Sequence, residues 1–511
     1  MLSNQGSLKT IVETIFLTAS PRLSPPRLAG RARRSLSTML SWALPVVVHL
    51  GFCVSAFAQQ ISVSPASALA ENNLIAGSDQ AMDFAGKQLV QPQPEASPNP
   101  SPTQNWAIHG DIIAIFQGQP GFHDPYNGPN SLQSQDDFRQ TTTADLFFGV
   151  RLWPGAEFYL NPEYYQGFGL GNTHGIAQFP NAEAYKVGQK VGDVFIPNLF
   201  IRQVFGFGGE QEHLDEGPLQ LAGNVDISRL TITAGKMAVG NQFDNNAYSH
   251  DPGAQFLNWA LVDAGGFDYA ADSLGYEYGL TAELNQKAWA ARAGYFTVPR
   301  YNNGLATDGH YLKAFELIGE LEGRYQLFGH PGKVRLTGWL LHQHLGDFSS
   351  LLRDQSVLIN GLREPYRTSY GGILNFEQEV AKDVGLFARL SYRDPRREAY
   401  MFSDIDKAFS IGVSVNGEAW KRSDDVFGFA YGVANIGVAH RDYFAEGGLG
   451  ILVGDGKLPH FGYENFIEAY YNVAVWKWVN FTVDYQLFVN PGYNEDRGPI
   501  NVFSGRVTLR F

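Results

Sequence analysis

The chain has 511 residues, of which 17% are charged and 14% aromatic, and its formal net charge is −13. This acidic balance argues against a nucleic-acid partner, because phosphate backbones are bound through an excess of Lys and Arg. Past the N-terminal region, no uninterrupted apolar run is long enough for a membrane helix. A helical membrane protein is therefore disfavoured, whereas a β-barrel, half of whose wall faces water, is not.

The N-terminal segment has the layout of an export signal. Basic residues precede an apolar run from Trp42 to Phe57, and the sequence A-F-A stands directly before Gln59. We predict a signal peptide over residues 1–58; a single membrane anchor is the alternative, weakened by a proline and a glycine inside the run. The only cysteine, Cys53, lies in this segment, so cleavage would leave no thiol for a disulfide, a zinc-thiolate site or a nucleophile.

Residues 59–105 differ in composition from everything that follows. Five prolines occur in the twelve residues from Gln91 to Pro102, and such a stretch favours extended, solvated conformations. We predict a flexible periplasmic segment, with a peptidoglycan- or protein-binding role as the alternative. Without residues 1–58, the chain has 32 basic and 50 acidic residues and a net charge of −18, which makes an anion-selective pore less expected.

From residue 106 onwards, apolar and polar residues alternate with the period of a β-strand. In the final segment, Val507 and Leu509 share one face, whereas Arg506 and Arg510 share the other. The same alternation recurs in segments of about ten residues, a length that suits tilted strands crossing a bilayer. The segments are 276–285, 315–328, 384–393, 464–473, 480–487 and 501–511.

This recurrence predicts an all-β fold, a transmembrane antiparallel β-barrel formed by residues 106–511. At roughly 25 residues per strand and its share of connections, the segment gives about 16 strands. The chain stops on the aromatic Phe511, which fits the C-terminal signal read by the barrel-assembly machinery of the outer membrane. The expected long loops are 119–140, 171–226, 241–272, 343–370 and 394–406.

Several long segments of the chain are rich in aromatic residues and glycine. They are Gly235–Ala260, Gly266–Asp272, Gly275–Gly279, Trp289–Phe296, Tyr463–Phe466 and Val489–Tyr493. These segments resemble the carbohydrate-selective porin family of the OprB type, and the likeness covers about 106–511. It implies an outer-membrane channel of a Gram-negative cell, through which sugars such as glucose diffuse down a constricted polar lumen. It further implies outer-membrane lipid as the surroundings and a possible homo-oligomer.

If the apolar face of each strand contacts lipid, the opposite face lines the lumen. Arg292 stands out, because its same-face neighbours Ala290 and Gly294 are small enough to let the guanidinium reach into the channel. Charges of both signs can hydrogen-bond sugar hydroxyls without favouring one ion; for any single residue, the alternative is a salt bridge that stiffens the wall. The predicted lumen residues are Glu277, Glu283, Arg292, Glu316, Glu320, Glu322, Arg324, Asn375, Glu377, Glu379, Arg389, Arg393, Asp484, Arg506 and Arg510.

The segment 241–272 is polar and aromatic and is a candidate for the loop that narrows the pore. An inward fold and a solvated extracellular loop are equally compatible with its sequence. Asp244 would then face the solute, and the ring of Trp259 could stack on a pyranose. Its carboxylates fit no calcium-binding spacing, and the pair His342 and His344 lacks a third ligand, so we expect neither metal nor cofactor.

The sequence supports two other functions less well. A general-diffusion or cation-preferring porin is the first alternative, given the net charge of −18. An outer-membrane hydrolase is the second, but the chain has no G-x-S-x-G elbow and no P-loop. We therefore predict a passive channel and not an enzyme.

Overall fold

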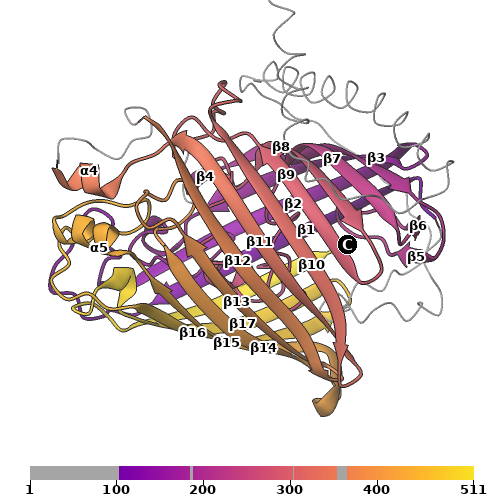
Figure 1. The fold of residues 1–511 in the computed structure, drawn as a ribbon. Coiled ribbons are helices and arrows are strands. Elements are labelled where there is room, and N and C mark those ends of the chain that lie inside the picture. Colours follow the sequence, from indigo (N-terminus) through magenta and orange to yellow (C-terminus); the bar gives the residue numbers. More distant parts are fainter. Residues whose placement is uncertain (1–102, 185–187, 303, 354–364) are drawn as a thin grey trace, which may run out of the picture. The chain divides into compact units, whose positions relative to one another are not determined.

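In a computed structural model, the described residues are 103–184, 188–302, 304–353 and 365–511. Sixteen antiparallel strands of these residues close into a barrel (Figure 1), in agreement with the predicted fold. The barrel closes where the first strand pairs with the last, for example Ile112 with Leu509. The predicted signal, 1–58, and nearly all of 59–105 lie outside the described residues.

The barrel strands contain between 8 and 18 residues each. They are β1 (Trp106–Gln119), β2 (Asp137–Trp153), β3 (Ala156–Gly167), β4 (Gln189–Gly206), β7 (Arg229–Met237), β8 (Glu277–Asn285), β9 (Trp289–Phe296), β10 (Phe315–Leu327), β11 (His330–His344), β12 (Tyr366–Ala381), β13 (Val384–Arg393), β14 (Lys407–Gly417), β15 (Arg422–Asn435), β16 (Glu464–Trp476), β17 (Val479–Val489) and β18 (Ile500–Arg510).

The two ends of the barrel are built differently. At one end, which we call the short-turn end, six of the seven connections contain two to four residues. The seventh, residues 207–228, carries the hairpin of β5 (Gln211–Leu214) and β6 (Gly223–Asp226). At the long-loop end, every connection contains ten residues or more, and these include the helices α4 (Phe348–Arg353) and α5 (Val438–Ala445), which lie together in Figure 1.

The predicted alternation of faces is confirmed along the wall. Large apolar side chains point outward and are exposed, such as Leu321 at 61%, whereas the neighbouring Glu320 points inward and is 2% exposed. All six alternating segments lie in strands, namely β8, β10, β13, β16, β17 and β18. Among the described residues, no helix combines the length and apolar character needed to cross a membrane.

One predicted loop is wrong. The range 171–226 contains β4, an 18-residue barrel strand, besides the small hairpin. Pro197 lies within β4, and the pairing with β3 shifts register between Asn161 and Glu163. Each irregularity interrupts the two-residue period on which the prediction depended. The long connections 297–314 and 436–463 were missed.

Candidate functional site: the lumen and its inserted loop

The connection between β7 and β8, residues 238–276, folds into the barrel. Its short helix α3 (Trp259–Val262) is capped by Asn258, whose side chain accepts a hydrogen bond from the Ala260 N–H. Phe256 packs edge-to-face against Tyr470 of β16, with ring centroids 4.9 Å apart. Leu257 packs against two inward-facing isoleucines of β1. The sequence was compatible with an inward fold or a solvated extracellular loop, and the inward fold is the one observed.

Carboxylates of the wall hold this loop by its backbone. Glu468 of β16 accepts hydrogen bonds from the N–H groups of Leu257 and Asn258, at 2.5 and 3.0 Å. Glu320 of β10 and Glu377 of β12 each accept one further loop N–H, at 2.8 and 2.9 Å. A loop inside a barrel has no sheet partner for these N–H groups, so acceptors on the wall replace the missing ladder.

A buried arginine completes the attachment. Arg389 of β13 is 1% exposed; its Nε lies 3.1 Å from the carboxylate of Asp244. The same guanidinium donates to the carbonyl oxygens of Leu261 and Ser249, at 2.7 and 2.8 Å. Charged groups on β10, β12, β13 and β16 therefore hold the loop in place, and polar atoms of the loop are their hydrogen-bond partners.

A second connection, residues 168–188, also packs inward. Glu464 of β16 accepts hydrogen bonds from the N–H groups of Ala177 and Gln178, at 3.0 and 2.7 Å. It accepts a third from Gly492, at 2.6 Å, so one carboxylate joins two long connections. We call the β13–β18 side, with the segments that cover it, the covered wall.

The inward face of β8–β12 differs, because its charged side chains pair with one another. Arg292 of β9 contacts Glu283 at 2.6 Å, Glu320 at 2.7 Å and Glu322 at 3.1 Å. The side chains of Arg292 and Glu283 are 16% and 26% exposed, so both retain contact with water. We call this set the charged row; its other members are Arg324, Lys333, Arg335 and Glu377.

The charged row is balanced, with four basic and four acidic side chains. It continues toward the short-turn end, where Arg324 donates to the side chain of Asn285 at 2.7 Å. A row of this kind offers many donors and acceptors but little net charge, which suits neutral, hydroxyl-rich solutes better than ions of one sign.

Comparison with known proteins identifies the family. The profile of the carbohydrate-selective porin, OprB family, matches residues 129–511. The chain belongs to this family. A structure of OprB from Pseudomonas putida at high pH is similar, with 18% identity, a TM-score of 0.61 and coverage of 80% of this chain and 94% of that one.

Two further structures of outer-membrane proteins show weaker similarity. The outer membrane channel DcaP of Acinetobacter baumannii is 9% identical with a TM-score of 0.46, over 80% of this chain and 97% of that one. OmpT of Vibrio cholerae is 10% identical with a TM-score of 0.41, also over 80% and 97%. A comparison with curated proteins found no match.

As an OprB-family porin, the protein is a passive channel of the outer membrane through which sugars diffuse. Short turns of outer-membrane barrels face the periplasm and long loops face outward. The short-turn end is therefore the periplasmic mouth of this porin, and the inserted loop enters from the outside.

Burial divides the predicted lumen residues of the porin into two groups. Arg292, Glu283 and Arg324 lie in the charged row and keep contact with water. The others are packed against loops, against each other or near strand ends. Among them, Glu377, Glu379, Arg389, Arg393, Asp244 and Glu277 are each at most 8% exposed.

Two of the packed residues have new partners that the sequence did not indicate. Glu277 accepts hydrogen bonds from the Tyr278 N–H and the Thr297 hydroxyl, at 2.9 and 2.7 Å. Arg393, at the long-loop end, pairs with Asp406 and is completely buried. The Arg393 guanidinium and one carboxylate oxygen of Glu277 therefore have partners within the protein.

Trp259 does not present a ring to the lumen. It stacks on Phe402 at 4.4 Å and on Phe179 at 5.4 Å, and only 4% of it is exposed. In this structure, no face of the indole is open for a pyranose. Its place explains why the loop sequence is aromatic, because its side chains form the core that the lumen-filling segments share.

The sequence prediction missed Lys333 and Arg335, which belong to the charged row. Both lie on β11, where Val334 and Leu336 face outward and Arg335 and Thr337 face inward. The alternation is present in the sequence, but the Pro-Gly pair at its start is more typical of a turn than of a strand. No group of three or more His, Cys, Asp or Glu that could hold a metal occurs in the described ranges.

Two carboxylates in the connections have shifted pKa values. Burial raises the pKa of Glu183 to about 7, with a further contribution from the negative charges of Asp111 and Asp251. Burial also acts to raise the pKa of Asp251, but Arg510, whose guanidinium donates to it at 2.8 Å, holds it below its usual range. Glu183 therefore changes charge near neutral pH, whereas Asp251 stays ionised.

Proposed function

We propose that sugars cross this porin along the charged row on β8–β12, with Arg292 and Glu283 as their main contacts. The observation that carries the proposal is the difference in burial. These two side chains retain water contact, whereas most other predicted lumen residues are covered by loops or by each other. A guanidinium and a carboxylate side by side can donate to and accept from neighbouring hydroxyls of one sugar ring.

The test is ion current through the purified porin in planar bilayers. We expect millimolar glucose or maltooligosaccharides to reduce the current. Arg292→Gln removes a charge-assisted hydrogen-bond donor, so the sugar concentration that halves the current should rise about tenfold. Glu283→Gln should weaken sugar binding as well, but it should shift ion selectivity toward anions, opposite to Arg292→Gln.

Arg396→Gln is the matched control, because Arg396 carries the same charge on an external loop and its side chain is 60% exposed. It should leave sugar block unchanged. Sugar block that survives both lumen substitutions would remove the charged row from the path. Open pores that no sugar affects would favour a general-diffusion porin instead.

We also propose that Phe511 is the residue read by the barrel-assembly machinery. Its backbone pairs with Gly110 of β1 at 2.8 and 2.9 Å, at the seam where the barrel closes, and its ring is 58% exposed. Deletion of Phe511 should reduce the fraction of assembled, heat-modifiable barrel in outer membranes several-fold. Wild-type assembly of the deletion variant would contradict this role. A homo-oligomer stays a prediction, which light scattering of the solubilised protein would measure.

A further inference from the structure

The connection between β4 and β7 is unlike the other turns at the periplasmic mouth. It contains residues 207–228, whereas its six counterparts contain two to four residues. Yet Gly206 and Arg229, the residues on either side of it, are direct partners in the sheet. A two-residue turn would therefore suffice to join the strands, and barrel closure does not require the longer connection.

The middle of this connection lies inside the barrel. Leu221 and Ala222 are 3% and 0% exposed, and the Leu221 N–H donates to the hydroxyl of Tyr159 at 3.1 Å. Arg202 donates to the Leu219 carbonyl oxygen at 3.1 Å, and Arg151 donates to that of Ala222 at 3.0 Å. These three partners belong to the inward faces of β2, β3 and β4.

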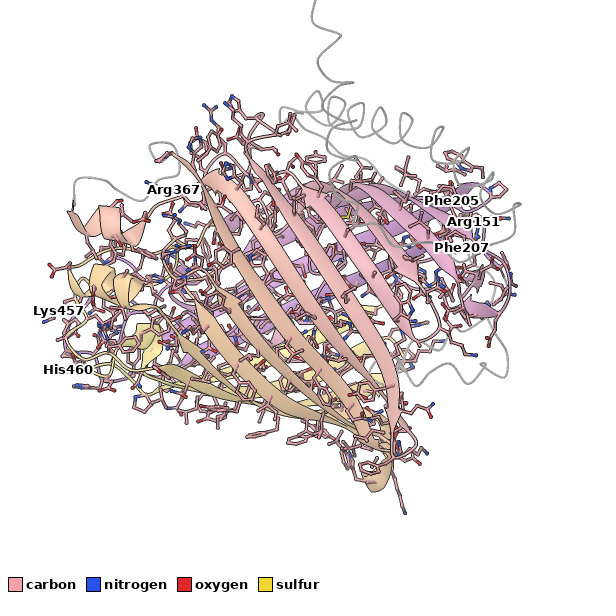
Figure 2. The ribbon with its side chains drawn as sticks, in the orientation of Figure 1. Arg151, Phe205, Phe207, Arg367, Lys457 and His460 are labelled. Carbon is pink, nitrogen blue, oxygen red and sulfur yellow. The ribbon has the colours of Figure 1, made fainter. Side chains whose placement is uncertain are left out.

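The attachment also includes the chain just before the barrel. The backbone N–H of Gln104 donates to the carbonyl oxygen of Ala222 at 3.0 Å, and the Ala222 N–H donates to the Gln104 side chain at 2.9 Å. A third bond joins the Gln104 side chain to Glu216. Residues 215–222 are thus held between the start of β1 and the inner wall. Figure 2 shows Arg151 at the same end of the barrel as β5 and β6.

The connection adds negative charge to the mouth. Arg151 and Arg202 face the carboxylate of Glu157 on β3, at 3.5 and 3.8 Å, and the connection takes up further donors of both guanidinium groups with its carbonyl oxygens. The connection brings no Lys or Arg of its own, and the Asp215 side chain is 71% exposed. Its five acidic residues are Glu210, Glu212, Asp215, Glu216 and Asp226. Of these, Glu210 and Glu212 pair with Lys287 and Arg229 of the barrel, at 2.8 and 2.6 Å.

We propose that residues 215–222 form a second constriction, at the periplasmic mouth, which selects against anionic solutes such as sugar acids and sugar phosphates while neutral sugars pass. The constriction is separate from the inserted loop, which enters from the outside. A narrow mouth bordered by fixed carboxylates repels anions most where the opening is smallest, because the field is focused there. The proposal does not depend on the role of Arg292.

The first test reverses one charge. Asp215→Lys should move the reversal potential in a salt gradient toward anions and raise the flux of gluconate relative to glucose several-fold in liposome swelling. Glu418→Lys is the matched control, because Glu418 is an exposed residue of another turn at the same mouth. If both variants change gluconate flux equally, or neither does, Asp215 does not border the permeation path and the proposal fails.

The second test removes the connection. Replacing residues 207–228 with Asn-Gly joins Gly206 to Arg229 through a two-residue turn that matches their pairing. We expect higher single-channel conductance and passage of larger anionic solutes, with sugar block at the charged row retained. Unchanged conductance in a correctly folded barrel would show that the connection is only a brace. If the shortened chain does not fold, Asp215→Lys still decides the question.

Discussion

The covered wall and the charged row use the same residue types for different purposes. On β16, Glu464 and Glu468 accept backbone N–H groups of inserted segments and are completely buried. On β8 and β9, Glu283 and Arg292 pair with each other and remain in contact with water. The comparison teaches that an inward-facing charge does not by itself mark the path of the solute. What separates these two pairs of residues is whether a loop backbone or another side chain satisfies the charge. Glu320 and Glu377 accept both kinds of donor and lie where the two regions meet.

The largest expected effect comes from breaking the covered wall. Arg389→Leu would leave the buried carboxylate of Asp244 without its cationic partner and the carbonyl oxygens of Ser249 and Leu261 without a donor. Removing one partner of a buried ion pair costs about 3–5 kcal/mol. We expect a loss of that size in the free energy of unfolding, measured by urea titration of the barrel in lipid vesicles.

Arg324→Leu is the comparison for that experiment, because Arg324 belongs to the charged row and its side chain is 24% exposed. Its loss should cost about 1–2 kcal/mol, since water can replace its partners. Arg389→Leu should also make the single-channel current noisier, because the loop loses an anchor. Equal destabilisation by the two variants would contradict the distinction between the covered wall and the charged row.

The barrel could be predicted from the sequence, because every lipid-facing strand must repeat the same alternation. Arg292 was found in the same way, since its small neighbours Ala290 and Gly294 share its face. The roles of Glu464 and Arg389 could not be predicted, because they depend on which loop backbone lies opposite. The packing of Trp259 between Phe179 and Phe402 joins three loops far apart in the chain, and periodicity carries no information about such contacts.

The carboxylate of Glu183 differs from those of the covered wall and of the charged row, and its substitution gives the smallest expected effect. Its carboxylate accepts only the Thr143 hydroxyl, at 3.3 Å, as a direct side-chain partner among the hydrogen bonds of the described residues. Burial, together with the charges of Asp111 and Asp251, raises its pKa to about 7. Because this pKa lies above that of an unfolded glutamate, near 4.5, the folded barrel holds the proton more tightly.

The stability contributed by protonated Glu183 is therefore complete below about pH 4.5 and is lost as the pH rises toward 7. Across this titration the lumen gains a negative charge, so cation preference should increase between pH 5.5 and 8.5. Glu183→Gln should flatten this change in reversal potential while leaving sugar block at the charged row as it is. A pH profile identical to that of the wild type would mean that the charge on Glu183 lies outside the ion path.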